Sequence, residues 1–524
     1  MTAITSATLP LATGLLPVAP TTAVPAATNL NAVPATVDSP ASVVSLGTAS
    51  MEAVDVYDVY TVRGTLAEAP PALIWETTSQ DKVTKTMAAN LASQDTGARF
   101  KGLGAALLTQ LANSGSSYSQ SVIQPKGTTA PSAAAVSALQ SGVHKTNDNV
   151  VSLTIKTASG ATVTLSLTSN TDGLATQVDV TGGELSDSEL AAVGKLAEGF
   201  QSAVDGLTAV PPKLNLDGLT GFDKSVLSSV DLTAKFKYGD IQSFSYSADA
   251  SGRTVSLSGV DGDLKLSVDT LNSAILGSAA QQAKALQTYL DKFDAARVRG
   301  EGNEQLMDMF KSAFTALNSN VGSATAASPG PVLSKTDRAL LTGLADFSAS
   351  ISQQAQAINP MRQNEVDTFA YTVSQSTQAK GAQANRSIDQ QQQSTLNASY
   401  HKGLYPGVAL ALGMDKTTQN YTYYKIEDSA SSASSIAYSK GEILKASLSQ
   451  SSSQSSTALR YVLGELQSST ITPKQFSESS SVKGLLDAAL KQDKDAGFGR
   501  NGPAYQRTLD NLQARVLSAL DVAK

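Results

Sequence analysis

Only two histidines and no cysteine occur among the 524 residues, so thiol chemistry is excluded and imidazole acid–base chemistry is confined to two positions. Imidazole is the side chain that most readily changes its protonation near neutral pH. His144 lies in the polar stretch 142–149, and His401 lies in Tyr400-His401-Lys402-Gly403. Neither has a carboxylate at the spacing of a catalytic motif. We therefore predict that both are solvated loop residues.

One glycine motif has the spacing of a dinucleotide-binding loop. Gly497-Phe498-Gly499-Arg500-Asn501-Gly502 matches GxGxxG. That fingerprint requires a buried parallel strand before it and a βαβ unit around it. Residues 491–495 are instead polar and charged, and Pro503 follows at once. The sequence predicts loop glycines before a helix and no nicotinamide cofactor.

Acidic turns offer the remaining candidates for a metal site. They are Asp172-Gly173, residues 179–187 and Asp261-Gly262-Asp263. The EF-hand spacing fails, because Leu190 stands where the bidentate glutamate is required if Asp179 is position one. Ordinary turn chemistry explains these residues better. The chain also lacks GxSxG, HExxH and GxxxxGK[ST] motifs. We therefore designate no catalytic, cofactor-binding or metal-ligating residue and expect no cofactor.

Composition narrows the possible partners. The chain is 41% hydrophobic and 16% charged, with a net charge of −6. A protein that tracks phosphates is usually basic, so we expect no nucleic-acid partner. No apolar run approaches the length of a membrane helix, so we expect no membrane span. A protein partner or self-assembly remains open. The N-terminus shows no ordinary secretory signal, which leaves cytoplasmic location and signal-less export as alternatives.

A repeated peptide is the clearest sign of architecture. Residues 158–166 and 250–258, which lie 92 positions apart, both read ASGxTVxLS. Apolar and polar residues alternate on both sides of each turn, which predicts two β-hairpins. Ser186 and Glu189 form a capping-box pattern that begins a helix after the first hairpin. A long helix from about Leu271 is expected after the second. The pattern predicts duplicated strand-strand-helix units with helices on one face of an antiparallel sheet.

Other segments are assigned from their periodicity. Helical stripes are predicted in three sets, which are Val83, Met87, Leu91, Phe100, Leu103, Leu107 and Leu111; Leu306, Phe310, Phe314 and Leu317; and Tyr505, Leu509, Leu512, Val516 and Leu520. Two further helical stripes are predicted at Leu340, Leu344, Phe347 and Ile351 and at Val366, Phe369 and Val373. The glutamines 390–393 are interpreted as a solvated helix face. Strands separated by serine-rich turns are predicted over 420–466.

These observations define an α+β fold class, with antiparallel β-hairpin units followed by helices, a large helical region and a second β-rich segment. The predicted segments are a disordered Ala/Thr/Pro leader at 1–50, a helical hairpin at 51–115, a linker at 116–147, the duplicated region at 148–300, a helical region at 301–405, an antiparallel β segment at 406–470 and C-terminal helices at 471–524. A short strand is also predicted at 54–62, within the 51–115 segment and before its two helices.

Two stretches carry a resemblance to known sequences. They are Gly183-Glu184-Leu185-Ser186-Asp187-Ser188-Glu189-Leu190 and Leu219-Thr220-Gly221-Phe222-Asp223. They resemble a group of uncharacterised bacterial proteins in which an acidic ELxxxEL helix and a GFD segment follow a β-hairpin. The resemblance covers about residues 150–240. That group has no established activity, so the resemblance implies no catalytic residue.

The sequence favours a non-enzymatic bacterial structural or protein-interaction protein, exported without a cleaved signal or retained in the cytoplasm. The absence of recognisable catalytic motifs and the repeated β unit motivate this hypothesis. The alternative is a soluble carboxylate-based hydrolase with a cleft between the β-rich and helical regions. Its acid and base would be assembled across the fold and would leave no local motif.

Overall fold

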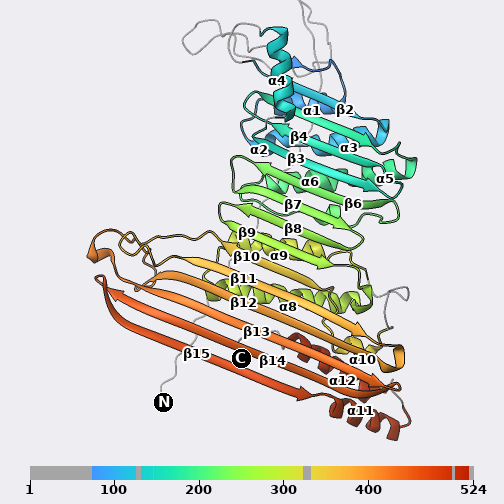
Figure 1. Ribbon diagram of the computed structural model, residues 1–524. Helices are drawn as coiled ribbons and strands as arrows, with labels where there is room; N and C mark the ends of the chain where they lie inside the picture. Colours follow the sequence, from blue (N-terminus) through green and yellow to red (C-terminus); the bar gives the residue numbers. More distant parts are fainter. Residues whose placement is uncertain (1–72, 126–130, 146, 323–331, 499–501, 519–524) are drawn as a thin grey trace, which may run out of the picture. The chain divides into compact units, whose positions relative to one another are not determined.

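The computed structural model describes residues 73–125, 131–145, 147–322, 332–498 and 502–518. The predicted leader at 1–50 and the predicted strand at 54–62 lie outside these ranges. Residues 70–524 form one compact unit. Within it a single 15-stranded sheet runs in the order β1-β2-β5-β4-β3-β6-β7-β8-β9-β10-β11-β12-β13-β14-β15 (Figure 1). From β6 to β15 each strand pairs antiparallel with the next along the chain.

The strands are β1 Ile74–Trp75, β2 Tyr118–Ile123, β3 Asn149–Thr157, β4 Thr162–Ser169, β5 Gly173–Thr181, β6 Leu227–Phe236, β7 Ile241–Asp249, β8 Gly252–Gly259, β9 Gly262–Asp269, β10 Phe347–Gln353, β11 Thr368–Lys380, β12 Ser387–Gly403, β13 Tyr421–Ser439, β14 Glu442–Val462 and β15 Glu465–Ser481. The helices are α1 Lys82–Asn90, α2 Thr96–Phe100, α3 Leu103–Ser114, α4 Ala133–Lys145, α5 Asp187–Lys195, α6 Ala197–Leu207, α7 Asp217–Thr220, α8 Ala279–Gly300, α9 Glu304–Asn318, α10 Lys335–Ala339, α11 Lys483–Asp495 and α12 Pro503–Ser518. Short 3-10 turns are η1 Ser273–Ile275, η2 Gln383–Asn385 and η3 Lys416–Thr418.

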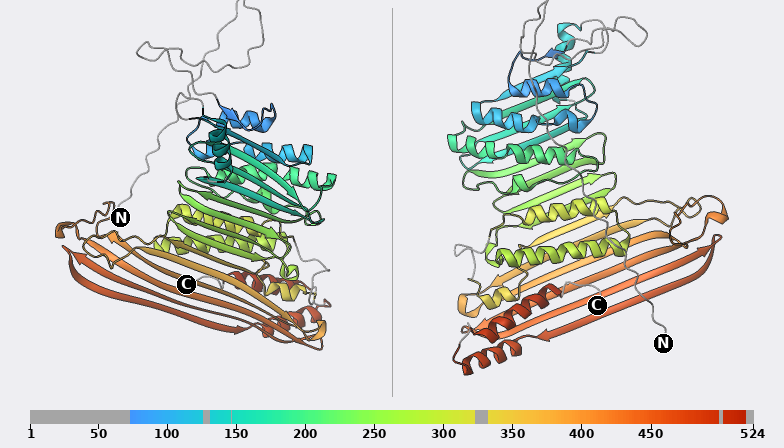
Figure 2. Two further views of the ribbon diagram at one scale, coloured as in Figure 1. Left: turned by 45° about the horizontal axis from the view of Figure 1, so that its top comes forward. Right: turned by 180° about the vertical axis from the view of Figure 1, so that it is seen from behind.

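The two faces of the sheet differ in what covers them. Helices α8, α9, α11 and α12 lie behind the sheet in Figure 1 and in front of it in the reverse view of Figure 2. We call this side the helix face and the other side the open face. In β6, Val230, Leu232 and Ala234 are buried toward the helices, whereas Asp231 and Thr233 are not. This period of two buries one face of a pleated strand and leaves the other in water.

Two large apolar clusters fill the helix face. The first joins α1–α3 and α5–α9 to strands β2–β13. Its densest part is aromatic, with Phe293, Phe310 and Phe314 in edge-to-face contact at centroid distances of 5.0 and 5.1 Å. The second cluster joins α10–α12 to β12–β14. On the open face, α4 packs over Ile123 and Ala175.

The α+β class, the antiparallel sheet and the C-terminal β-rich segment are confirmed. Both ASGxTVxLS peptides form a hairpin turn and its second strand, between β3 and β4 and between β7 and β8. The helical stripes of α1, α3 and α9 are also confirmed. The repeat units contain more strands than predicted, since β5, β6 and β9 extend the sheet. Duplication as the origin of the units stays a prediction.

The predicted large helical region is wrong over much of its length. Helix α9 is present, but β10, β11 and β12 occupy most of 347–403. The stripe through Phe369 and Val373 belongs to a strand, in which Phe369, Tyr371, Val373 and Gln375 are buried at every second position. A spacing of four fits a helix and a strand alike, and Tyr371 between the two was the signal for a strand.

The predicted solvated helix at 390–393 is also wrong, because these glutamines lie in β12. Gln390 and Gln392 are buried at 0% and 2% exposure. The side-chain carbonyl of Gln390 accepts a hydrogen bond from the backbone N–H of Thr342 at 2.9 Å, and its side-chain NH₂ donates to Thr377 Oγ1. An amide side chain can satisfy backbone groups that a loop leaves unpaired, which allows glutamine in a buried strand.

Three further expectations fail in part. The predicted linker 116–147 contains β2 and α4. The serine runs of 420–466 lie inside β13 and β14 and not in turns. Residues 471–481, predicted to be helical, belong to β15, although α11 and α12 follow. The boundaries of the predicted segments stay a prediction.

A buried arginine distinguishes the two repeated peptides. Arg253 is 2% exposed and stands where the first peptide has Ala161. Its guanidinium donates to the carbonyls of Leu317, Ser319 and Asn320 at the end of α9, and to Thr220 O at the end of α7. Carbonyls at a helix C-terminus lack intrahelical partners and carry partial negative charge. Arg253 therefore fixes two helix ends against β8.

We expect Arg253→Met to lower the free energy of unfolding by about 3 kcal/mol, because several buried carbonyls lose a charged donor. Urea denaturation followed by circular dichroism measures this. Arg460→Met removes an exposed arginine from β14 and should change stability by less than about 0.5 kcal/mol. Equal effects of the two substitutions would contradict the role assigned to Arg253.

The predicted capping box at the start of α5 is present and extends to the first repeat. Glu189 accepts from Ser186 N at 2.9 Å and from Ser186 Oγ at 2.8 Å. Its other oxygen accepts from Ser159 Oγ, in the β3–β4 turn, at 2.7 Å. The hydrogen bonds from Ser159 and Ser186 lower the pKa of Glu189 to about 2. The carboxylate thus ties the hairpin turn to the helix.

This lowered pKa makes a stability contribution that is present above the ordinary value of 4.5 and is lost as the pH falls toward 2. We expect Glu189→Gln to lower the free energy of unfolding by about 1 kcal/mol at pH 7, and the deficit to shrink as the pH falls from 4.5. Urea denaturation at pH 7 and pH 3 tests this. Glu184→Gln, at an exposed position, should show no such pH-dependent deficit.

Candidate interaction surface

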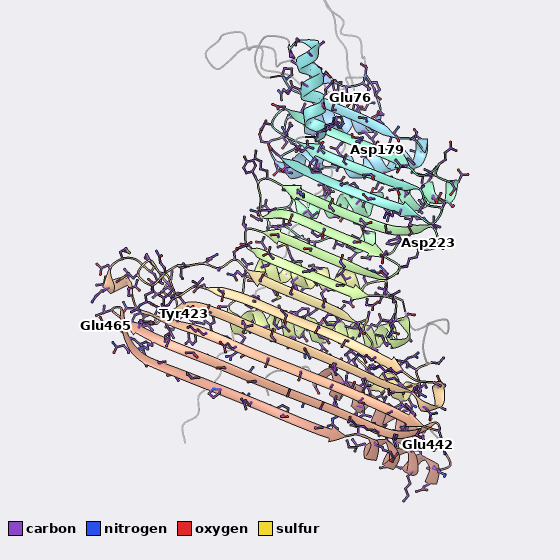
Figure 3. The ribbon with its side chains drawn as sticks, in the orientation of Figure 1. Glu76, Asp179, Asp223, Tyr423, Glu442 and Glu465 are labelled. Carbon is purple, nitrogen blue, oxygen red and sulfur yellow. The ribbon has the colours of Figure 1, made fainter. Side chains whose placement is uncertain are left out.

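The last four strands are unusually long, at 17, 19, 21 and 17 residues for β12 to β15. They extend past the end of α8 (Figure 2). Tyr423 and Glu465 mark the extended end, and Glu442 marks the opposite end beside α11 (Figure 3). At the extended end no helix of the described ranges lies behind the sheet.

Serine and glutamine form rows across the open face of these strands. One row consists of residues that oppose one another on neighbouring strands, namely Gln393, Ser431, Ser451 and Ser477. Ser431 Oγ and Ser451 Oγ lie 2.8 Å apart, within hydrogen-bond distance. The same residues line a surface hollow. Residues 447–459 carry no charged side chain. Short hydroxyls in register give a polar surface with few charges to desolvate on contact.

Among the described strands, β15 is the last in the sheet and pairs only with β14. Every residue of β15 is exposed except Ser480, which is half-buried. Leu466, Ile471 and Phe476 are 52%, 66% and 41% exposed. The opposite edge, β1, has two residues. An edge strand presents unpaired N–H and C=O groups that can pair with another chain. Of the two edge strands, β15 therefore offers the longer row of such groups.

A buried polar cluster lies on the open face near the extended end. It centres on His401 of β12, whose side chain is 0% exposed. Its Nδ1 lies 2.5 Å from Asp367 Oδ1, and its Nε2 lies 3.3 Å from Glu365 Oε2. Both ring nitrogens can donate only when both carry a proton. The ring stands between Tyr421 and Tyr423, with centroid distances of 4.9 and 4.7 Å.

Tyrosine hydroxyls complete the cluster. Tyr421 donates to Glu365 Oε2 at 2.6 Å, and Tyr423 donates to Val366 O at 2.9 Å. Burial and the bond to Glu365 raise the pKa of Tyr421 well above its ordinary value. Desolvation likewise raises the pKa of Tyr461 to about 12. These hydroxyls therefore stay protonated at neutral pH and serve as donors.

Segment 354–367 is attached through this cluster to the sheet and to residues 404–420. Asn359 of segment 354–367 donates to Gln419 Oε1 and to Tyr421 Oη, both at 2.9 Å. The Arg362 guanidinium stacks over the Tyr461 ring at 4.3 Å and donates to Gly464 O. The arrangement fixes the ends of β12, β13 and β14 relative to one another. Its chemistry is that of a satisfied structural network.

The solvated-loop prediction is wrong for both histidines. His401 lies in a strand, and its carboxylates come from a segment more than thirty positions away, so local motif spacing could not reveal them. His144 lies in the last turn of α4, and its Nε2 lies 2.9 Å from Glu76 Oε2. Burial raises the pKa of Glu76, but hydrogen bonds from His144, Ser121 and Ser119 outweigh it and hold that pKa below its ordinary value.

The glycine motif leads into α12, as predicted, although residues 499–501 lie outside the described ranges. The Asp493 carboxylate accepts the backbone N–H groups of Ala504 and Tyr505 at 3.0 and 2.7 Å. A dinucleotide phosphate would use these helix N-terminal donors. Asp493 already occupies them and acts as the cap.

Other buried carboxylates also have partners. Asp337 accepts from Arg386 Nη2 at 2.7 Å and from Tyr438 Oη at 2.6 Å. Asp428 lies 3.0 Å from Arg299 Nε. Within the described ranges, no group of three or more His, Asp or Glu is arranged to hold a metal ion. None of the helices in these ranges is long and apolar enough to cross a membrane.

We expect His401→Leu to cost about 3 kcal/mol of unfolding free energy, because Asp367 and Glu365 would each lose a hydrogen-bond partner in the cluster. Amide hydrogen exchange in 354–367, the segment that carries Glu365 and Asp367, should accelerate. His144→Leu breaks a more exposed pair and should cost less than about 1 kcal/mol. Urea denaturation and hydrogen exchange measure both variants, and an unchanged exchange rate in His401→Leu would refute the anchoring role.

Comparison with known proteins adds no further assignment. No family model, curated protein or solved structure matches the chain.

Proposed function

We propose that this protein is a non-enzymatic structural or protein-interaction protein, and that its contact surface is the long-strand end of the sheet, β12 to β15. The observation that carries the proposal is β15, a 17-residue edge strand with exposed residues along nearly its whole length. Soluble proteins usually keep edge strands short or covered. A long exposed edge is suited to binding another chain by strand addition.

The composition of the surface supports the same function. Serine and glutamine, rather than lysine and glutamate, keep β14 and β15 soluble. The centre of a protein interface is depleted in charged side chains, because each charge must lose its water. Residues 447–459 meet that condition without forming an apolar patch. This combination favours reversible or regulated contact between folded proteins.

The alternative, a carboxylate-based hydrolase, has less support. Such an enzyme needs two carboxylates facing a substrate cavity. Glu365 and Asp367 are adjacent in the fold, but each holds His401, whose side chain is fully buried. Asp337 and Asp428 are neutralised by arginines. The interaction hypothesis holds for either cytoplasmic or exported protein.

The proposal is tested by crosslinking the protein in its native cell and detecting it on blots. We expect species of higher mass that decrease at least fivefold when Ile471→Lys and Phe476→Lys are combined, because two charges would be placed in the contact. Val298→Lys with Leu271→Lys, at exposed apolar positions outside β15, should leave them unchanged. Detection of monomer alone after crosslinking in the cell would overturn the proposal.

A further inference from the structure

We propose that β15 pairs antiparallel with β15 of a second copy of this chain, about a two-fold axis that passes between the two copies of Phe476. The inference rests on the proposed function and names the partner. Pairing in this way would join two 15-stranded sheets edge to edge. Closed two-fold dimers are the commonest assembly of identical chains, and each copy uses the same surface.

The geometry of the pleat restricts which registers can form. Side chains of directly opposed residues in an antiparallel pair point to the same face of the sheet. A two-fold axis perpendicular to the sheet keeps each side chain on its own face. Opposed residues must therefore differ by an even number, and one residue must face its own copy across the axis. These conditions leave one register for each possible central residue.

Charge selects among these registers. The charged residues of β15 are Glu465, Lys474 and Glu478. Lys474 and Glu465 differ by an odd number and cannot oppose each other. Lys474 and Glu478 can, and they do so in the register centred on Phe476, which forms the pair twice. The register centred on Lys474 would instead oppose two lysines, which is destabilising.

The central residue fits this register. Phe476 is a large apolar side chain, 41% exposed, on the same face as Lys474 and Glu478. At the axis it would oppose its own copy, and aromatic cross-strand pairs are among the favourable ones. Each copy would contribute residues 471–481, and Ile471 would oppose Ser481.

Two further residues of β15, Pro473 and Glu478, are compatible with this register. Pro473 lacks an N–H, and proline within a sheet is confined to edge strands where that position faces solvent. In the proposed register Pro473 opposes Ser479, so the ladder loses one donor on each side. Glu478 also lies 3.7 Å from Arg515 of α12 and accepts from Gln450 at 3.3 Å. It is half-exposed, which leaves room for Lys474 of the second copy.

The absence of cysteine allows a direct test of register. Full-length Lys474→Cys and Glu478→Cys proteins are mixed and oxidised. The Cα atoms of opposed residues lie about 4.5–5.5 Å apart, a distance that a disulfide can span. We expect the mixture to form a disulfide-linked dimer at least tenfold faster than either variant alone. Lys474→Cys mixed with Thr472→Cys, on the same face but out of register, should match the single variants.

Exchange of the charges provides an independent test without cysteine. Lys474→Glu and Glu478→Lys should each weaken the dimer about fivefold, as measured by sedimentation equilibrium, because like charges oppose each other. The combined Lys474→Glu/Glu478→Lys protein should recover the original dissociation constant. A heterologous partner of fixed charge would not give that recovery.

The two proposals fail in different ways. If the protein is monomeric at native concentration but the change at Ile471 and Phe476 still removes crosslinked species in cells, β15 binds a different protein and the self-pairing is wrong. Crosslinks in the Thr472→Cys mixture, with none in the Glu478→Cys mixture, would reject this register. If no β15 variant reduces the crosslinked species of higher mass, the interaction function itself is rejected.

Discussion

The hydrogen-bond ladder of one uninterrupted antiparallel sheet is the constraint on which the rest of the structure depends. Each strand from β6 to β14 has its backbone groups shared between two neighbours, so the register of one strand fixes that of the next. The apolar side chains then fall on one face, and the helices cover it. A shift of one residue in any strand would turn its buried side to water.

The same constraint explains the polar C-terminal strands. Once β12 and β13 are aligned by their apolar ends, at Ile388 and Ile436 on one side and near Tyr421 on the other, the serine stretches between them must also pair. Their hydrogen bonds are those of the backbone, and no apolar core is needed at every position. The His401 cluster and the α10–α12 cluster hold the two ends of this region.

A sheet that is not closed must have edges, and here the two edges differ. At one edge β1 is short, whereas at the other β15 is long and exposed. The proposed interaction function is based on this asymmetry and on no catalytic group. The polar clusters at Arg253, Glu189, Asp493 and His401 satisfy buried polar groups and helix ends, so they support the scaffold.

By itself the sequence determined the α+β class, the hairpins at 158–166 and 250–258, the capping box at Ser186 and several amphipathic helices, because these depend on spacings of two to four residues. Tertiary structure decided whether residues 369–373 and 390–393 became helix or strand, since both periods fit so short a segment and the neighbouring strand selects one. It also brought Asp367 and Glu365 to His401 and made β15 an edge. Those relations join residues distant in sequence, which no local pattern records.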